Sequence, residues 1–342
     1  MRLLQAMAGA QHGGAEAFFE RLVGALHNTD IDQKIVIRKG PEREARLASY
    51  GVTAKTLPFG GMLDMYTPLA LRCMAKHFKP DVVMTWMNRA TAKMPRGDYL
   101  HVARLGGFYD LKYYKHCDHL VGNTRGIVDY LIEQGWPADR AHYLPNFVTV
   151  DAAPPISRAE FDTPEDAPLL LSMGRLHTNK AFDTLLDAMI SVEGAYLWIA
   201  GEGPERLALE TQAYNRGVDQ RVRFLGWRQD IAALLATCDI YVCPSRHEPL
   251  GNVVIEGWAA GKPVVAAASR GPSELITHDD SGFLSPIDDA AAMAANLNRV
   301  MGDADLGAQL VAGGTRAYEA AFTQDVVVQK YMEFFDHIRG VR

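Results

Sequence analysis

The stretch IYVCPSRHEPLGNVVIEGWAAGKPVVAA, from Ile240 to Ala267, contains two short apolar runs separated by a segment with helical spacing. We expect strands at Ile240–Cys243 and Val264–Ala267, with a helix at Val253–Ala260 between them. Parallel strands joined by a crossing helix read as nearly continuous apolar runs, because both faces of their sheet are covered. This stretch therefore predicts one unit of an α/β fold with a parallel sheet.

The same alternation extends through the rest of the chain. In the second half it predicts strands at Leu169–Met173, Tyr196–Ala200 and Val222–Leu225, and helices at Ala181–Ile190, Glu205–Arg216 and Ile231–Ala236. In the first half it predicts helices at Ala15–His27, Pro68–Phe78 and Thr124–Gln134, and strands at Arg2–Ala6, Lys34–Arg38, Ala54–Leu57, Asp81–Trp86, Tyr99–Arg104, His119–Gly122 and His142–Leu144. We therefore expect two Rossmann-like units, each a doubly wound parallel sheet. Ligands of such sheets bind beyond the carboxyl ends of the strands, so the expected site is the cleft between the units.

A proline-rich segment separates the two halves. Residues Val148–Pro168 include four prolines, which regular helices and central strands do not accommodate, so we expect a linker there. The 342 residues exceed the size of one compact core. We place the first domain at residues 1–150 and the second at 151–322. The tail from Asp288 to Gly340 predicts three helices, and the last of them, within 323–342, is expected to pack back on the first domain.

The composition is that of a globular protein. Apolar residues make up 48% of the chain and charged residues 22%, which excludes a disordered chain or a coiled coil. The apolar runs are too short to span a bilayer, and the residues after Arg2 lack the apolar core of a signal peptide. The four cysteines have neither zinc-site nor redox-motif spacing, so we expect a reducing, cytoplasmic setting.

The charge is divided unevenly. Residues 1–150 hold 19 Lys and Arg against 14 Asp and Glu, a balance of +5, and residues 151–342 hold 16 against 27, a balance of −11. Either the split is incidental, or the first half meets an anionic partner, such as a phosphorylated molecule or an anionic membrane surface. The chain has no RNA-binding signature or basic recognition helix, so we expect no nucleic acid.

Two glutamates flank the start of the helix in the opening stretch. Glu248 precedes it, Glu256 lies about one turn inside, and Leu250, Gly251 and Asn252 lead into its first turn. The free N–H groups of such a turn attract anions and hydroxyl-rich ligands. Both carboxylates can face one ligand, because a carboxylate accepts two hydrogen bonds from the vicinal hydroxyls of a sugar or ribose. Alternatively, Glu248 caps the helix and Glu256 is a solvated helical residue.

Together with the downstream sequences SRGPSELI and DDSGFL, this stretch resembles the donor-binding signature of retaining glycosyltransferases of the GT-B fold, especially family 4, the glycosyl transferases group 1. The resemblance covers most of the chain and weakens in the first 100 residues. It implies two Rossmann-like domains that face each other across a cleft. It also implies donor-binding roles for further residues. Gly174, Arg175 and Lys180 in GRLHTNKAFDTLL would hold the diphosphate, and Trp227 after Phe224-Leu225-Gly226 would approach the nucleotide base. Gly13 and Gly14 in Gly13-Gly14-Ala15-Glu16 would form a glycine loop near the phosphates.

The chemistry of these residues supports the same roles. The planar guanidinium of Arg175 matches phosphate geometry, and Lys180 adds a point charge. Gly13 and Gly14 lack a Cβ and let backbone amides approach an anion. The alternatives are exposed surface charges for the first pair and an ordinary β–α turn for the second. Gly201-Glu202-Gly203-Pro204 resembles a family turn, which tight turning alone also explains.

The sequence departs from the family at a histidine that usually follows the strand corresponding to Tyr99–Arg104. Here the strand is followed by Leu105-Gly106-Gly107, and His101 lies inside it. We therefore assign no catalytic histidine and interpret His101 as a hydrogen-bonded strand residue. Pro249 after the first glutamate and Gly257 after the second also depart from the family, but both carboxylates remain.

We expect neither metal nor cofactor. His116, Cys117, Asp118 and His119 lie close in sequence, but no second cluster with zinc-site spacing accompanies them, so we interpret them as a polar helix-to-strand junction. There is also no Asp-x-Asp pair at a strand end to hold a divalent ion on a diphosphate. Arg175, Lys180 and helix N-termini can supply the positive charge for the leaving group.

The resemblance implies a retaining, metal-independent transfer of a hexose-type sugar from a nucleoside-diphosphate sugar, with UDP-sugar favoured, to a glycan or glycolipid acceptor. The expected setting is cell-surface polysaccharide or lipopolysaccharide synthesis, with peripheral association at the inner membrane face. Glu248, Arg175 and Lys180 would carry catalysis, Glu256 would hold ribose, and the first domain would hold the acceptor. Two alternatives remain open: a nucleotide-sugar epimerase on the same fold, and a noncatalytic nucleotide- or sugar-binding protein.

Overall fold

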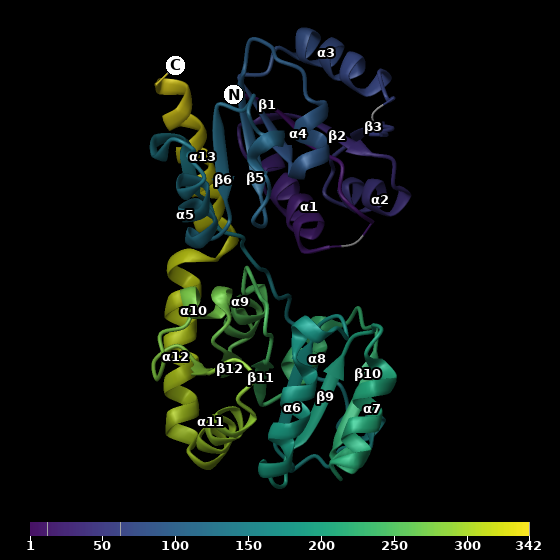
Figure 1. Cartoon of the computed structure of the whole chain (residues 1–342), viewed down its shortest axis with the longest axis vertical. Helices are drawn as coiled ribbons and strands as arrows, with labels where there is room; N and C mark the ends of the chain where they lie inside the picture. The colour runs from purple at the N-terminus through teal and green to yellow at the C-terminus, as the bar shows by residue number, and fades with distance from the viewer. Residues whose placement is uncertain (12, 62, 342) are drawn as a thin grey trace. The chain divides into compact units, whose positions relative to one another are not determined.

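The computed structural model describes residues 1–11, 13–61 and 63–341. The chain divides into two compact units (Figure 1). Unit 1 comprises Met1–Phe147 and Gln324–Arg342, and unit 2 comprises Val148–Thr323. The boundaries expected at residues 150 and 322 thus lie at 147 and 323.

Unit 1 is built on a seven-stranded sheet in the order β3-β2-β1-β4-β5-β6-β7, in which neighbouring strands are parallel. The strands are β1 (Arg2–Met7), β2 (Asp32–Arg38), β3 (Ala54–Leu57), β4 (Val82–Trp86), β5 (Leu100–Leu105), β6 (His119–Gly122) and β7 (Ala141–Tyr143). The helices around the sheet are α1 (Gly14–His27), α2 (Pro41–Ser49), α3 (Tyr66–Phe78), α4 (Met87–Lys93), α5 (Arg125–Glu133) and α13 (Gln324–Gly340), with short 3-10 turns η1 (Leu111–Tyr113) and η2 (Ala138–Arg140).

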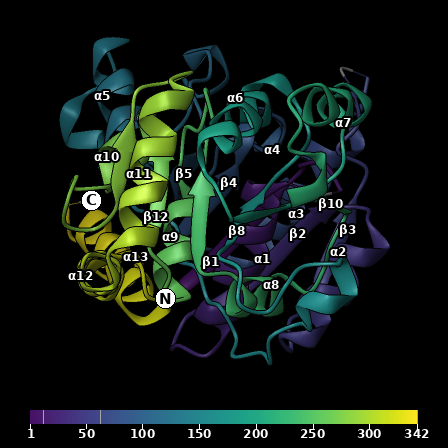
Figure 2. The same cartoon turned by 90° about the horizontal axis from the view of Figure 1, so that it is seen from below.

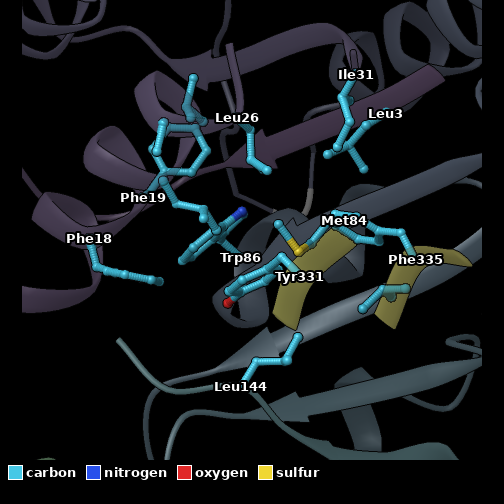
Figure 3. Close-up of a cluster of buried hydrophobic side chains, with 14 of the residues drawn as sticks. Leu3, Phe18, Phe19, Leu26, Ile31, Met84, Trp86, Leu144, Tyr331 and Phe335 are labelled. Carbon is cyan, nitrogen blue, oxygen red and sulfur yellow. The ribbon is translucent and has the colours of Figure 1, made fainter. Parts of the chain in front are cut away.

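The last helix, α13, is part of the core of unit 1 although it is the most distant element in sequence. Figure 3 shows Tyr331 and Phe335 of α13 beside Met84 and Trp86 of β4. The guanidinium of the buried Arg104, on β5, donates to the hydroxyl of Tyr331 at 2.8 Å and also to Asn146. It lies 4.5 Å above the ring of Phe18 and 4.7 Å above that of Trp86. Apolar packing and the hydrogen bond from Arg104 therefore hold α13 on unit 1, and the cation–π contacts with Phe18 and Trp86 hold the guanidinium in place.

Unit 2 is built on a six-stranded parallel sheet in the order β10-β9-β8-β11-β12-β13, with helices packed around it (Figures 1 and 2). The strands are β8 (Leu169–Met173), β9 (Tyr196–Ala200), β10 (Val222–Gly226), β11 (Ile240–Cys243), β12 (Val264–Ala267) and β13 (Phe283–Ser285). The helices are α6 (Phe182–Ala188), α7 (Arg206–Asn215), α8 (Ile231–Thr237), α9 (Asn252–Ala259), α10 (Arg270–Leu275), α11 (Ala290–Gly302) and α12 (Ala304–Ala321), with 3-10 turns η3 (Arg158–Phe161), η4 (Thr178–Lys180), η5 (Met189–Ser191) and η6 (Asp219–Arg221).

The strand order of unit 2 reverses between β8 and β11. The chain proceeds from β8 to β9 and β10 on one side, and from β11 to β12 and β13 on the other. The loops that leave β8 and β11 at their carboxyl ends therefore diverge, and such a switch point is where ligands of open parallel sheets bind. The doubly wound architecture predicted from the sequence is confirmed.

The prediction of a linker at Val148–Pro168 is wrong for most of that segment. It belongs to unit 2, where the backbone of Ile156 donates to the hydroxyl of Thr237 at 2.8 Å. Arg158 donates to the backbone of Ala167 and pairs with Asp239. Prolines prevent regular helix and strand here, but they do not prevent side-chain and backbone hydrogen bonds from fastening the segment to a neighbouring sheet.

Within the described residues, no helix combines the length and the apolar character that a bilayer-spanning segment needs.

Candidate active site

The predicted donor residues of unit 2 lie on loops that leave one edge of its sheet. Arg175 and Lys180 follow β8, Trp227 follows β10, and Glu248 follows β11. Because parallel strands end at the same edge, these loops emerge together beyond the carboxyl ends of the strands.

Lys180 and Glu248 meet at the switch point between β8 and β11. The Lys180 Nζ lies 2.5 Å from the Glu248 Oε2, and the two side chains are 24% and 10% exposed. The other carboxylate oxygen of Glu248 accepts the N–H of Gly251 at 3.4 Å. Glu248 therefore supports the helix start, as one interpretation of the sequence held, and at the same time carries a charge paired with the lysine.

The charge state of Lys180 follows from this pairing. Burial alone would lower the pKa of its ammonium, but the adjacent carboxylate of Glu248 outweighs burial and raises the pKa above its usual value, with help from Cys243 and Glu256. The site therefore holds a permanently charged ammonium that is already neutralised by an internal anion. A phosphate that approached this lysine would have to compete with Glu248 or share the lysine with it.

Gly251 sets the start of α9. Its backbone adopts the left-handed conformation with φ of 70°, which favours glycine, and Asn252 then begins the helix. On its other side, the loop contacts the start of α10, where the backbone N–H of Gly271 donates to the carbonyl of Glu248 at 2.8 Å. A Cβ at Gly271 would lie 2.6 Å from that carbonyl oxygen, so the glycine in SRGPSELI permits this close approach.

Glu256 is not a solvated helical residue. Its side chain is half-buried in α9, and the hydroxyl of Tyr241, a fully buried residue of β11, donates to its Oε2 at 3.5 Å. Burial and the charge of Glu256 both raise the pKa of Tyr241, so the phenol stays protonated and remains a donor. The contact orients the second carboxylate of the predicted pair.

Arg175 and Trp227 present their side chains to solvent. Arg175 is exposed, and no hydrogen bond or ion pair holds its guanidinium within the described residues. Trp227 is 68% exposed and follows Gly226, which ends β10 in the left-handed conformation. The structure thus pairs Lys180 with Glu248 but does not bring Arg175 or Trp227 into that pair.

The two glycines after β9, Gly201 and Gly203, are explained by packing. A Cβ at Gly201 would overlap the carbonyl of Gly174, and a Cβ at Gly203 would overlap that of Leu176. The N–H of Leu176 donates to the carbonyl of Glu202 at 3.0 Å, which joins the two loops. The two glycines therefore permit the close approach of the β8 and β9 loops, which is a different reason from the tight turn suggested by the sequence.

Arg246 is a structural residue of the site that the sequence interpretation missed. Its guanidinium donates to both oxygens of Asp183 at 2.8 and 2.6 Å, donates to the carbonyl of Thr178 at 2.7 Å, and pairs with Asp288 at 2.5 Å. It therefore ties the loop that carries Glu248 to the segment that carries Lys180. Its partner Asp183 is 63 residues away in sequence, so no local pattern indicates the contact.

In unit 1, the predicted glycine loop contains a carboxylate of the protein itself. Glu16, 5% exposed on α1, accepts the backbone N–H of Ala10 at 2.7 Å. A Cβ at Gly9 or at Gly13 would overlap its carboxylate, and Gly14 is the first residue of α1. The glycines therefore make room for Glu16 here, a role that the sequence interpretation did not consider. His12 lies outside the described residues.

His101 is a hydrogen-bonded residue inside β5, as interpreted from the sequence. It is 4% exposed, and its Nε2 lies 3.0 Å from the hydroxyl of Thr85. Burial lowers its pKa to about 4, so the ring is neutral at physiological pH. Among the residues that the structure describes, no three His, Cys, Asp or Glu side chains are grouped as a metal site would require.

Comparison with a solved structure defines the fold of the protein. The chain is similar to the crystal structure of Anabaena Alr3699/HepE in complex with UDP and glucose, with a TM-score of 0.83 and 20% identity, covering 98% of this chain and 100% of the other. The two Rossmann-like units and this likeness define the GT-B fold of glycosyltransferases.

The sequence comparisons define the family. Residues 155–316 match the family described as Glycosyl transferases group 1. The chain is 36% identical over 335 residues, 96% of each chain, to the lipopolysaccharide core biosynthesis glycosyltransferase LpsD of Rhizobium meliloti (strain 1021). It is 35% identical over 325 residues, 94% of this chain and 95% of the other, to LpsE of the same organism, which carries the same description. The chain belongs to the group 1 glycosyl transferases and is a glycosyltransferase.

Proposed function

We propose that this glycosyltransferase moves a hexose from a nucleoside-diphosphate sugar to a glycan of the lipopolysaccharide core, with retention of anomeric configuration and without a metal ion. The observation that carries the donor assignment is the Lys180–Glu248 pair at the switch point of unit 2. UDP is the favoured nucleotide. This choice is supported by Anabaena Alr3699/HepE, a protein of similar fold whose crystal structure contains UDP and glucose.

The side chains of unit 2 divide the work of donor binding. Lys180 and the unpaired guanidinium of Arg175 neutralise the diphosphate. These two cationic side chains supply the positive charge that a metal ion would otherwise supply. Glu248, with the backbone amides of Leu250–Asn252, orients the hydroxyls of the sugar. Glu256, held by Tyr241, accepts from the ribose hydroxyls, and the exposed ring of Trp227 offers a face to the base.

The chemical step breaks the bond between the anomeric carbon and the diphosphate oxygen. The acceptor hydroxyl attacks the anomeric carbon on the face that the diphosphate leaves, and its proton passes to the departing diphosphate oxygen. The positive charge of Lys180 and Arg175 stabilises that leaving group. The family resemblance supports retention.

The acceptor assignment is carried by the relatives LpsD and LpsE, both described as lipopolysaccharide core biosynthesis glycosyltransferases. Residues 1–150 carry the +5 charge balance, which suits the anionic, lipid-linked glycan that we assign to the first domain.

Product analysis tests the proposal. Purified protein with UDP-hexoses and a truncated lipopolysaccharide core should release UDP and extend the glycan, and NMR of the product should show the anomeric configuration of the donor. Chelator should leave the rate unchanged. An epimeric nucleotide sugar would instead identify an epimerase, and donor binding without turnover would identify a binding protein.

A further inference from the structure

The neighbouring strands β5 and β6 of unit 1 end together at the carboxyl edge of its sheet (Figure 1). Their last paired residues are Leu105 and Gly122, so Gly106 and Asn123 are the first residues beyond the pairing. Ligands of open parallel sheets bind beyond this edge. Asn123 is therefore a polar side chain at a place where a ligand of unit 1 would be held.

The amide of Asn123 is buried without a partner for its oxygen. The residue is 5% exposed, and its Oδ1 accepts no hydrogen bond from the described part of the chain. Nearly all buried polar atoms of folded proteins are hydrogen-bonded, because an unpaired one costs free energy. A functional partner outside the chain is one of the few explanations for such an atom.

The backbone on both sides of Asn123 is fixed. The carbonyl of Gly122 accepts the N–H of Leu144 at 3.0 Å. The hydroxyl of Thr124 accepts the N–H of Ile127 at 3.1 Å and caps the start of α5. Asn123 is thus held between a strand and a capped helix, and its amide has little freedom to turn toward another partner within the protein.

The surroundings of the amide come from α1 and from the segment after β5. A Cβ at Gly106 would lie 3.8 Å from the Asn123 Nδ2 and 3.9 Å from the Cβ of Ala15, in the first turn of α1. A Cβ at Gly107 would lie 3.5 Å from the hydroxyl of Tyr109. The amide, the start of α1 and a half-buried aromatic ring therefore border the same two glycines.

The side chains near this edge suit a hydroxyl better than a phosphate. Glu16, the next residue of α1, is a carboxylate, and burial together with its charge raises the pKa of Tyr109, so the phenol stays protonated. The buried cation of β5, Arg104, already donates to Tyr331 and Asn146. A diphosphate offers only acceptor oxygens and cannot donate to the Asn123 Oδ1, whereas a sugar hydroxyl can.

We propose that Asn123 binds a hydroxyl of the acceptor sugar next to the one that attacks the donor. The Oδ1 of Asn123 accepts the hydrogen of this hydroxyl, and the ring of Tyr109 bounds the sugar that carries it. The attacking hydroxyl keeps its own hydrogen, so its proton passes to the departing diphosphate oxygen as proposed above. Asn123 thereby selects which hydroxyl of the acceptor faces the donor. This inference rests on the glycan acceptor of the proposed function.

The substitution Asn123→Leu tests it, because leucine keeps the branched shape of the side chain and removes its polar atoms. With a truncated lipopolysaccharide core as acceptor, the acceptor's Michaelis constant should rise about three- to tenfold, the value of one neutral hydrogen bond. Calorimetric binding of UDP should be unchanged. The thermal midpoint should be unchanged or higher, since the variant buries no unpaired oxygen. A merely structural asparagine would instead give a lower midpoint and an unchanged acceptor constant.

A matched control is Asn296 on α11, another buried asparagine, whose amide is hydrogen-bonded. It is 9% exposed, and its Nδ2 donates to the carbonyl of Leu284 at 3.3 Å and to the hydroxyl of Ser285 at 3.0 Å. Asn296→Leu should lower the thermal midpoint, because it leaves these two partners unpaired. It should leave the acceptor's Michaelis constant unchanged.

Monodeoxy forms of the acceptor sugar identify the hydroxyl. One form should bind wild type about three- to tenfold more weakly and should lose nothing further against Asn123→Leu, because the hydrogen bond is already absent there. Independent losses for every form would overturn the proposal. An unchanged acceptor constant in Asn123→Leu, or a rise in the donor's constant alone, would do the same.

Failure of the proposed function has a different signature. In that case the wild type binds UDP but extends no glycan. Calorimetric titration with the truncated core oligosaccharide, in the presence of UDP, then tests the role of Asn123 by binding alone. Weaker binding by Asn123→Leu than by wild type would support this role, and equal binding, or no binding by either protein, would refute it.

Discussion

The two glutamates of unit 2 are held differently, and this difference predicts different kinetic roles. Glu248 faces Lys180, so Glu248→Gln removes the anion that competes with a bound diphosphate while also removing the carboxylate assigned to the reacting sugar. Turnover should fall roughly ten- to a hundredfold, the value of one charge-assisted hydrogen bond in the transition state. Binding of UDP, which has no sugar, should be unchanged or tighter, measured by calorimetric titration.

Glu256 is assigned to ribose, a part of the donor that does not change during the reaction. Glu256→Gln should therefore weaken UDP binding and chiefly raise the apparent Michaelis constant of the donor. Tyr241→Phe removes the hydroxyl that donates to Glu256. It should also raise the apparent Michaelis constant of the donor, by a smaller amount. If Glu256→Gln lowers turnover while UDP binding is retained, the two roles are reversed.

The glycine loop of unit 1 can be tested by a double-mutant cycle. Gly13 has an extended backbone, with φ of 165°, that any residue adopts, so only the overlap with Glu16 opposes Gly13→Ala. The substitution should cost about 1–3 kcal/mol of unfolding free energy, the usual cost of overpacking. In a Glu16→Ala background the same substitution should cost much less. Additive effects in denaturant titrations would show that Gly13 has another role.

At the scale of elements, the sequence predicts what its local periodicity encodes. The strands of both sheets other than β13, and the three helices of the tail, follow from apolar runs and helical spacing. The three-residue β13 and the six-residue α10 were not predicted, because such short elements show too little periodicity. The contacts that build the site were also missed. Arg246 reaches Asp183 across 63 residues, and only the fold brings them together.

The attachment of α13 also depends on a contact that no local sequence pattern indicates, because Arg104 and Tyr331 are 227 residues apart. Tyr331→Phe leaves the buried guanidinium without its Nε partner, and this should destabilise unit 1 by about 1–3 kcal/mol. A matched control is Tyr318→Phe on α12, where the lost hydroxyl donates to the backbone of Val148 in unit 2 at a half-buried position. Tyr318→Phe should lower the free energy of unfolding by less than Tyr331→Phe. Chemical denaturation of both variants provides the measurement.

At the scale of the whole molecule, the buried His101 and the half-buried His142 make stability depend on pH. Burial lowers the pKa of His101 and of His142 to about 4, well below the value of about 6.5 for an unfolded histidine. The unfolded chain therefore binds more protons than the folded one between pH 6.5 and 4. Stability is fully present above pH 6.5 and is lost progressively as the pH falls through that window.

For His101, which is 4% exposed, this loss is on the order of 2–3 kcal/mol by pH 4. Both histidines lie in unit 1, so this contribution to acid destabilisation belongs to that unit. Denaturant titrations from pH 7.5 to 4 should show the decline, and His142→Gln should make it shallower because one of the two titrating rings is absent. A wild-type stability that stays constant across this range would contradict the burial of neutral imidazoles in β5 and β7, and with it the way these strands are packed.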